Sequence, residues 1–367
     1  MERPRVLVAA PLPPPITGQS VVTEMAVRVL HDHASVEILD TTVDDAPVRD
    51  GGGPPVGRAV RWVSHLSRLR TMLQTTRPDV FYFTPASSVR GLLRDRATLA
   101  LVPSATRVVA HFHVANYDVL LRHAVWSRPA SSVLRRLDAA VLPSAYAANR
   151  LLRAAPDVPA HVVPNVVPVD RRVTADELEA KWGRSPARKR SVLFLANLLP
   201  EKGHELLADA LVQMNGEAPD HVVVAGAWPS DATRARYEAR LRVLGLADRV
   251  EVTGALTGAE VRERLLEANV FVFPSTCPSE SFGLSLLEGM HAGCAAIAVD
   301  HAAAGELVHD GVEGRLVAPT AGALAAGLAD AQRHAERFGR AAASRARDAY
   351  GAERFEDELP RVVLGLS

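Results

Sequence analysis

The chain is poor in the residues that mark several common protein classes. It has 367 residues but only two cysteines, too few for a disulfide framework or a cysteine-ligated metal site. No apolar run reaches the roughly 18 to 20 residues that a membrane-spanning helix needs. The N-terminal residues lead straight into the strand-like run RVLVAA, without the apolar segment and cleavage site of a secretory signal. These absences predict reduced thiols and a cytoplasmic protein.

Several motifs for nucleotides and metals are missing as well. The sequence has no G-x-x-x-x-G-K-[ST] phosphate loop and no G-x-G-x-x-G after its first strand-like run. An NTPase and an ordinary dehydrogenase are therefore disfavoured. It also has no Asp-x-Asp that would hold a divalent cation on a diphosphate. We therefore predict no metal ligands, and any diphosphate must be neutralised by the protein itself.

Basic charge is unevenly spread along a chain whose formal net charge is zero. Residues 1–172 carry +7 and the remainder carries −7, with 39 arginines and three lysines in all. A basic N-terminal part favours an anionic acceptor or a membrane surface, although drift in composition between two domains explains it equally well. We expect no nucleic-acid partner.

One basic segment, Arg58–Leu73, has the pattern of an amphipathic helix. Such helices lie on anionic membranes or pack against a sheet, and we favour the second interpretation, so peripheral membrane contact is a lesser alternative. Its predicted apolar side is Trp62, Leu66, Leu69 and Leu73, and its polar side Arg61, His65 and Arg68.

Short runs rich in β-branched residues alternate with helical patterns throughout the chain. Apolar strands without polar alternation, separated by helices, indicate parallel sheets covered on both faces. The fold class is therefore α/β and doubly wound. The predicted strands are Arg5–Ala10, Val36–Leu39, Val80–Thr84, Val108–Phe112, Ala139–Leu142 and His161–Pro164, then Val192–Ala196, His221–Ala225, Val250–Thr253, Val270–Phe273 and Ala295–Val299.

Two domains are predicted, 1–172 and 173–350, because strand–helix alternation restarts at Val192 after a polar, basic segment. The tail is helical in pattern apart from Tyr350–Gly351 and Pro360, and we expect a helix at about 351–367 to pack back on the first domain. Thr41–Gly57 is rich in Gly, Pro and Asp and is predicted to be an exposed loop.

The most informative stretch is Pro274–Val299, PSTCPSESFGLSLLEGMHAGCAAIAV. It follows an apolar strand and enters a helix near Gly283, whose free N–H groups and positive dipole end suit a diphosphate. Ligands of open parallel sheets bind at this end of the strands. Glu280 lies in the loop and Glu288 two helical turns further on. Carboxylates at such places accept hydrogen bonds from sugar and ribose hydroxyls, although by spacing alone both are more often solvated surface charges.

This stretch resembles the E-x7-E signature of the large retaining GT-B glycosyltransferase family, family 4. The resemblance covers nearly the whole chain. It implies the GT-B fold, in which two Rossmann-like domains face a central cleft, the first binding the acceptor and the second the nucleotide sugar. Further segments are similar to the family's motifs in the same order: PPPITGQS (13–20), HFHVANYD (111–118), LPSAYAANRL (142–151), VPNVV (163–167) and LANLLPEKGHELLADAL (195–211).

The resemblance assigns roles to individual positions. Lys202 matches the lysine that grips the donor phosphates, and a point charge on a flexible stem suits that task. Asn197 stands where the family commonly has an arginine, which removes one positive charge from the presumed diphosphate site. Catalytic roles are implied for His113, Lys202 and Glu280. Nucleotide-sugar binding is implied for Gly18, Asn197, Lys202, Glu280, Ser281, Phe282, Gly283, Leu284 and Glu288.

The His-x-His segment keeps three interpretations open. His113 matches the family histidine near the donor sugar, with His111 as the weaker match. The pair also fits a structural role or, least well, half of a metal site.

The resemblance implies a retaining transferase that moves a sugar from a nucleotide-diphospho-sugar, its co-substrate, to a hydroxyl acceptor, with no obligatory metal or other cofactor. Two alternatives remain open: a nucleotide-sugar epimerase on the same architecture and a non-catalytic nucleotide-sugar-binding subunit.

Overall fold

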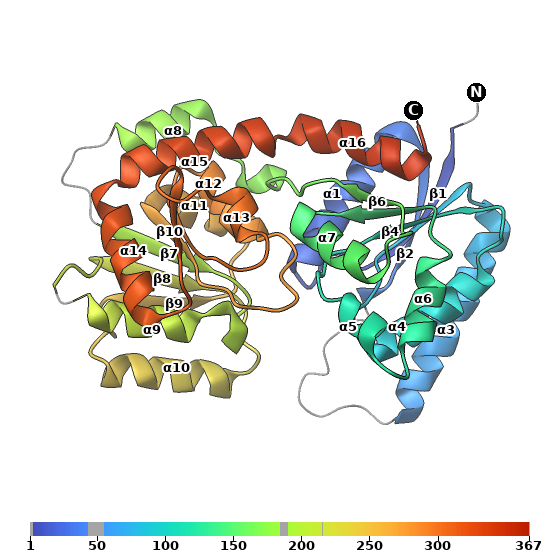
Figure 1. Ribbon diagram of the computed structural model, residues 1–367, viewed down its shortest axis with the longest axis horizontal. Helices are drawn as coiled ribbons and strands as arrows, with labels where there is room; N and C mark the ends of the chain where they lie inside the picture. The colour runs from blue at the N-terminus through green and yellow to red at the C-terminus, as the bar shows by residue number, and fades with distance from the viewer. Residues whose placement is uncertain (1–2, 43–54, 184–189, 215, 367) are drawn as a thin grey trace. The chain divides into compact units, whose positions relative to one another are not determined.

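The computed structural model describes residues 3–42, 55–183, 190–214 and 216–366. The chain divides into two compact units (Figure 1). Unit 1 is Met1–Asn165 together with Glu353–Ser367, and unit 2 is Val166–Ala352. Most of the predicted loop Thr41–Gly57 lies outside the described residues.

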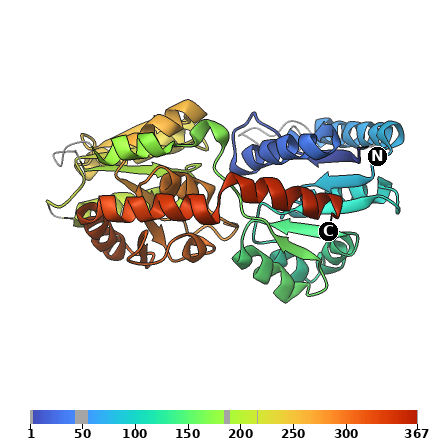
Figure 2. The same ribbon diagram turned by 90° about the horizontal axis from the view of Figure 1, so that it is seen from above.

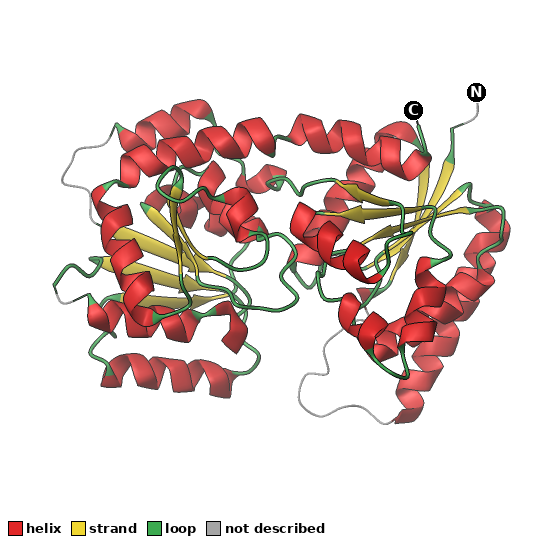
Figure 3. Ribbon diagram, viewed as in Figure 1, coloured by secondary structure: helices red, strands yellow, loops and turns green. Residues whose placement is uncertain are grey.

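Unit 1 is built on a parallel sheet, which has six strands in the described part of the chain and the order β2-β1-β3-β4-β5-β6. Helices cover both faces of the sheet (Figure 3). Its elements are β1 (Arg5–Ala10), α1 (Gly18–His33), β2 (Ser35–Asp40), α3 (Pro55–Thr76), β3 (Val80–Phe83), α4 (Val89–Leu101), β4 (Arg107–His111), α5 (Asp118–Arg122), α6 (Ser127–Leu134), β5 (Ala139–Leu142), α7 (Ala145–Ala154) and β6 (Ala160–Val162).

Unit 2 repeats this plan, with the strand order β12-β11-β10-β7-β8-β9 over its described residues. Its elements are η1 (Val169–Arg171), α8 (Ala175–Trp182), β7 (Ser191–Leu195), η2 (Pro200–Lys202), α9 (His204–Gln213), β8 (His221–Ala225), α10 (Asp231–Val243), β9 (Val250–Gly254), α11 (Gly258–Glu267), β10 (Val270–Phe273), α12 (Leu284–His291), β11 (Ala295–Val299), α13 (Ala304–Leu307), β12 (Gly314–Val317), α14 (Ala321–Arg333) and α15 (Ala335–Ala349).

The strands of unit 2 alternate their side chains between two apolar layers. Val192 and Phe194 of β7 pack in a layer with α9 and α14, whereas Leu193 between them packs on the other face with α11 and α12. A strand buried on both faces has no polar alternation, which is why apolar runs predicted these strands. The predicted α/β, doubly wound class is confirmed.

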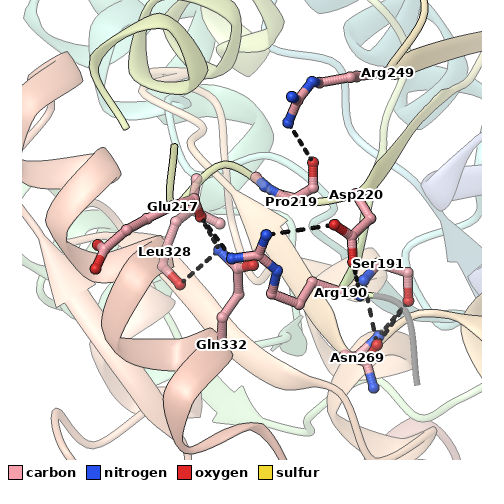
Figure 4. A network of polar contacts seen from close by, with 9 residues as sticks. All are labelled: Arg190, Ser191, Glu217, Pro219, Asp220, Arg249, Asn269, Leu328 and Gln332. Atoms are coloured by element: carbon pink, nitrogen blue, oxygen red, sulfur yellow. Dashed lines mark hydrogen bonds and ion pairs between the residues drawn. The ribbon is translucent and has the colours of Figure 1, made fainter. Parts of the chain in front are cut away.

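Polar contacts tie together the residues that precede the strands of unit 2 (Figure 4). Asp220 accepts a hydrogen bond from the backbone N–H of Arg190 at 2.8 Å, and the side chain of Ser191 donates to Asn269 Oδ1 at 2.8 Å. Arg249 donates to the carbonyl oxygen of Pro219. These bonds join the starts of β7, β8, β9 and β10. The loops that follow the strands lie at the opposite edge of the sheet.

The helix α16 (Ala352–Leu364) belongs almost entirely to unit 1. The guanidinium of Arg107, the first residue of β4, donates to the carbonyl oxygens of Val362 and Val363 at 3.1 and 3.2 Å. Figures 1 and 2 show α16 beside α1. The tail thus returns to the sheet of the first unit.

The division at Asn165 lies earlier than the sequence-based boundary after residue 172. Residues 166–172 pack on unit 2, because Val167 joins its apolar core and Arg171 pairs with Glu288 on α12. The boundary between domains was therefore predicted a few residues late.

The basic helix α3 packs its end on the sheet of unit 1, where Leu69 and Leu73 join the apolar core. Its predicted faces are partly wrong at Trp62 and His65. Trp62 was expected on the apolar side and is 37% exposed, whereas His65 was expected on the polar side and is 5% exposed.

Candidate active site

The candidate site of unit 2 begins where the strand order reverses. The chain runs from β7 outward to β8 and β9, then returns to β10 on the other side of β7 and continues to β11 and β12. The loops that follow β7 and β10 therefore leave neighbouring strands in opposite directions, which opens a binding position at the carboxyl edge of the sheet.

These two loops are bound to each other through η2. The backbone N–H of Thr276 donates to the carbonyl oxygen of Glu201 at 2.9 Å. Gly203, which ends η2, has φ +86°, and a Cβ on it would lie 2.2 Å from the carbonyl oxygen of Pro274. Only glycine allows this left-handed turn and this close approach. The turn presents Lys202, the residue just before it, to the loop after β10.

Lys202 and Glu280 form an ion pair across the two loops, with Nζ and Oε2 2.7 Å apart. The side chains are 20% and 14% exposed, so solvent screens the pair only in part. The hydroxyl of Ser275 also donates to Glu280 Oε2, at 3.3 Å. The structure thus brings together the lysine and the acid that the sequence predicted to act at one donor.

The helix α12 starts at the same place. Its N-cap, Gly283, has φ +99°, and the residues before it, Ser281 and Phe282, are buried. The first-turn N–H groups of a helix have no partner within the helix, and its dipole is positive at this end. Leu284 is the first residue of α12. The arrangement suits a phosphate-bearing ligand.

Glu288 lies further along α12 and is 1% exposed. Its Oε1 accepts from the guanidinium of Arg171 at 2.7 Å. Burial raises the pKa of Glu288 to about 7, while Arg171 acts in the opposite direction and Asp170 adds to the rise. The sequence singled out Glu288 but gave no signal for Arg171, one of 39 arginines and 117 positions away.

Asn197 lies just after β7, at the start of the loop that leads to Lys202, and is exposed. Its backbone carbonyl accepts from Leu199 N–H at 2.7 Å. The residue therefore sits on the same loop as the predicted phosphate-binding lysine.

Two predicted site residues, Gly18 and His113, belong to unit 1 rather than unit 2. Gly18 is the first residue of α1, whose N-cap Thr17 is held by a capping box with Ser20. Gln19 donates to the hydroxyl of Thr84, which follows β3, at 3.1 Å. In unit 1 the strand order reverses between β1 and β3, so Gly18 lies at the corresponding switch point of the first sheet.

His113 packs its ring against His111, with centroids 4.3 Å apart. His111 is fully buried and its Nδ1 is 2.5 Å from the hydroxyl of Tyr82. Burial holds the pKa of His111 well below its usual range and lowers that of His113 to about 3, so both rings are neutral. Burial also raises the pKa of Tyr82, so its hydroxyl keeps its proton and shares a hydrogen bond with Nδ1. The sequence gave no signal for Tyr82.

Substituting Tyr82 by phenylalanine removes the hydrogen-bond partner of Nδ1 of His111. We expect a loss of about 1–2 kcal/mol in unfolding free energy and a changed ratio of the two His111 tautomers, because among the described residues Tyr82 is the partner of Nδ1 and Nε2 has none. Urea denaturation and ¹⁵N NMR of the imidazole nitrogens measure the two effects. Tyr117→Phe, which loses only a 3.4 Å bond to the Ala130 carbonyl, should leave the tautomer unchanged. An unchanged His111 tautomer in Tyr82→Phe contradicts the assignment.

The described residues contain neither a cluster of metal ligands nor a helix that could span a membrane. Within 3–42, 55–183, 190–214 and 216–366, no three His, Cys, Asp or Glu side chains gather as metal ligands would. In the same ranges, no helix is both long enough and apolar enough to cross a membrane.

Comparisons with known proteins agree with the sequence resemblance. Residues 176–345 match the family described as Glycosyl transferases group 1. The lipopolysaccharide core biosynthesis mannosyltransferase LpsB of Rhizobium meliloti (strain 1021) is 31% identical over 235 residues, which are 62% of this chain. The chain spans 59% of the length of that relative.

Two solved structures share the fold over 99% of this chain. Sucrose-phosphate synthase (tll1590) from Thermosynechococcus elongatus has a TM-score of 0.79 at 17% identity over 99% of its own chain. Anabaena Alr3699/HepE, solved in complex with UDP and glucose, has a TM-score of 0.76 at 16% identity over its whole chain. At such identities the likeness shows the fold alone. The similarity to the group 1 glycosyltransferases is carried by residues 176–345, within unit 2, and the likeness in fold extends over the whole chain.

Proposed function

We propose that the chain is a retaining, family 4 enzyme that transfers a sugar from a nucleotide-diphospho-sugar to a hydroxyl acceptor without an obligatory metal. The observation that carries the proposal is the Lys202–Glu280 pair beside the start of α12, at the switch point of the sheet. Similarity to a protein named a mannosyltransferase and to a fold solved with UDP and glucose supports this substrate class.

Departure of the nucleoside diphosphate builds negative charge on the phosphate that leaves. In this proposal Lys202 and the N–H groups at the start of α12 stabilise that charge, because donors already held in place need no reorganisation during the reaction. Asn197 contributes a neutral hydrogen bond where the family commonly has a cation. Glu280 accepts hydrogen bonds from the donor sugar and orients Lys202, and Glu288 accepts from the ribose.

The roles of unit 1 rest on the resemblance to family 4. His113 and Gly18 are its residues with an assigned place near the reacting sugar, and unit 1 is proposed to take the acceptor. A neutral His113 is a hydrogen-bond partner rather than a cation, which fits a contact with sugar hydroxyls. The acceptor is a glycan, a glycolipid or a small natural product.

A thermal-shift screen tests the proposed donor class. UDP and GDP, then UDP-glucose and GDP-mannose, are added to the full chain, once with Mg²⁺ and once with EDTA. A ligand at 100 times its Kd stabilises the folded state by about 2.7 kcal/mol, which corresponds to a rise in Tm of several degrees. We expect such a rise with one nucleotide and its sugar form. No shift with any of the four contradicts the donor class, and a shift abolished by EDTA contradicts metal independence.

Product analysis separates the alternatives. A transferase releases nucleoside diphosphate slowly without an acceptor and preserves the anomeric configuration of the sugar that it transfers. An epimerase converts the sugar nucleotide with no acceptor present, and a binding subunit gives a thermal shift but no turnover. NMR of the sugar nucleotide and of the product distinguishes these outcomes, and an inverted anomer overturns the retaining assignment.

A further inference from the structure

The single helical turn η1, Val169–Arg171, and the residue after it contact several neighbouring segments of unit 2. The carboxylate of Asp170 lies against the first residue of α11, where a Cβ on Gly258 would be 1.6 Å from Oδ2. The Arg172 carbonyl accepts from Arg262 Nε at 3.0 Å, and Arg172 Nε donates to the Val167 carbonyl at 3.0 Å. These contacts fix the direction in which Arg171 leaves the turn.

From this turn, the side chain of Arg171 extends to Glu288 on α12 and forms an ion pair with it. NH1 lies 2.7 Å from Oε1, and the two side chains are 11% and 1% exposed. A buried carboxylate is costly unless it is paired and hydrogen-bonded. Yet Arg171 satisfies one oxygen only. Among the residues that the structure describes, Glu288 Oε2 and Arg171 Nε are buried and have no hydrogen-bond partner.

The second carboxylate oxygen is therefore an acceptor held ready for a donor from outside the chain. A carboxylate accepts at both oxygens when it is ionised, whereas a protonated carboxyl has lost part of this capacity. The charged groups that act on Glu288 are both on η1: Arg171 favours the ionised form and Asp170 disfavours it. Removing the guanidinium would leave burial unopposed, so the carboxyl would be protonated at neutral pH.

We propose that Arg171 is a positioning residue of the donor site, which holds Glu288 so that Oε2 accepts the ribose hydroxyls of the nucleotide. The inference rests on the proposed function, which supplies the nucleotide. It adds a residue that the motifs of the sequence do not contain. Arg171 does not touch the reacting sugar and acts through Glu288. The hydrogen bonds that Arg172 makes with Arg262 and Val167 keep η1, and with it Arg171, in place.

The test compares ligands that differ only in the ribose hydroxyls. Dissociation constants of UDP and GDP, and of their 2′,3′-dideoxy forms, are measured by calorimetry on the full chain. For the wild type we expect the nucleotide that binds to do so about 10-fold or more tightly than its dideoxy form, because the buried acceptor is left unsatisfied without the diol. In Arg171→Met this ratio falls toward 1, while the affinity for the dideoxy form changes less than about twofold.

Further variants separate positioning from general stability. Arg171→Lys keeps a cation and retains an intermediate ratio. Gly258→Ala meets only the side chain of Asp170, whose carboxylate can turn aside, so this variant keeps η1 in place and the wild-type ratio. Arg236→Met, at an exposed arginine of α10, keeps the wild-type ratio. The affinity ratio between the nucleotide and its dideoxy form should also depend on pH. In the wild type it should fall as the pH drops below about 7, where Glu288 becomes protonated. In Arg171→Met this fall should occur at a higher pH, because the pKa of Glu288 rises without the guanidinium.

The outcomes distinguish the two proposals. A wild-type ratio in folded Arg171→Met overturns the inference and leaves the donor class intact. Failure of the wild type to bind either nucleotide overturns the proposed function and, with it, the inference. If Arg171→Met does not fold, the ratio of Arg171→Lys decides, and a wild-type value there overturns the positioning role.

Discussion

Glu280→Ala is expected to slow release of nucleoside diphosphate from the sugar donor by about 100- to 1,000-fold, the loss typical of one preorganised polar contact at a reacting centre. The carboxylate is 14% exposed and lies 2.7 Å from the ammonium of Lys202. Its removal takes an acceptor from the donor sugar and releases Lys202 from its fixed position. Both losses act on the transition state, so kcat should fall more than KM rises.

Steady-state kinetics with the nucleotide sugar that passes the thermal-shift screen measure this effect. Glu280→Gln keeps the shape of the side chain and removes its charge, so the loss of activity in this variant measures the contribution of the ion pair. Glu263→Ala, at an exposed glutamate of α11, serves as the control and should keep full activity. Because Glu280 and Lys202 are in contact, Glu280→Ala and Lys202→Met should be non-additive by about 0.5–3 kcal/mol in a double-mutant cycle. Unchanged turnover in Glu280→Ala would refute the site assignment.

Strands buried on both faces could be predicted from the sequence because burial leaves a simple pattern. β8, β10 and β11 begin and end at the predicted residues, His221–Ala225, Val270–Phe273 and Ala295–Val299. The strand β12, Gly314–Val317, was missed. It lies at the edge of its sheet, its two central residues are only half-buried, and Glu313–Gly314 precedes its apolar residues, so it lacks the apolar run that marks the others.

In the C-terminal segment, the rule that proline breaks a helix gave one wrong prediction. The break expected at Tyr350–Gly351 separates α15 from α16, but the break expected at Pro360 does not occur. Proline removes one backbone hydrogen bond from a helix. In α16 its ring lies on the buried face with Phe355, Leu359 and Val363, and that burial offsets the loss.

Some residues of the candidate site could be predicted from their neighbours in the sequence, whereas others depend on contacts with residues far along the chain. Lys202, Glu280 and Glu288 stand in recognisable stretches, each with a glycine that shapes a turn nearby. Arg171 and Tyr82 act through partners far along the chain, and neither is distinguished by its neighbours in the sequence. Arg171 meets Glu288 of α12 only because η1 packs on α11, and Tyr82 meets His111 only because β3 pairs with β4.

Gly203→Ala is expected to cost more than about 2 kcal/mol of unfolding free energy and to weaken nucleotide binding at least about 10-fold. The backbone is left-handed at φ +86°, which costs a residue with a Cβ about 1–2 kcal/mol. The Cβ would also lie 2.2 Å from the carbonyl oxygen of Pro274 and 2.9 Å from its Cγ. Backbone atoms cannot move aside as a flexible side chain can, so the loops after β7 and β10 must separate.

The control Gly245→Ala isolates the second effect. Gly245 has φ +70°, and a Cβ there would meet no atom within 4 Å, so this variant carries the backbone strain without the collision. It should lose about 1 kcal/mol and bind nucleotide as the wild type does. Urea denaturation and calorimetry measure both quantities. If Gly203→Ala behaves like Gly245→Ala, then the contact between the two loops does not hold Lys202 against Glu280, and the ion pair must be maintained by the side chains themselves.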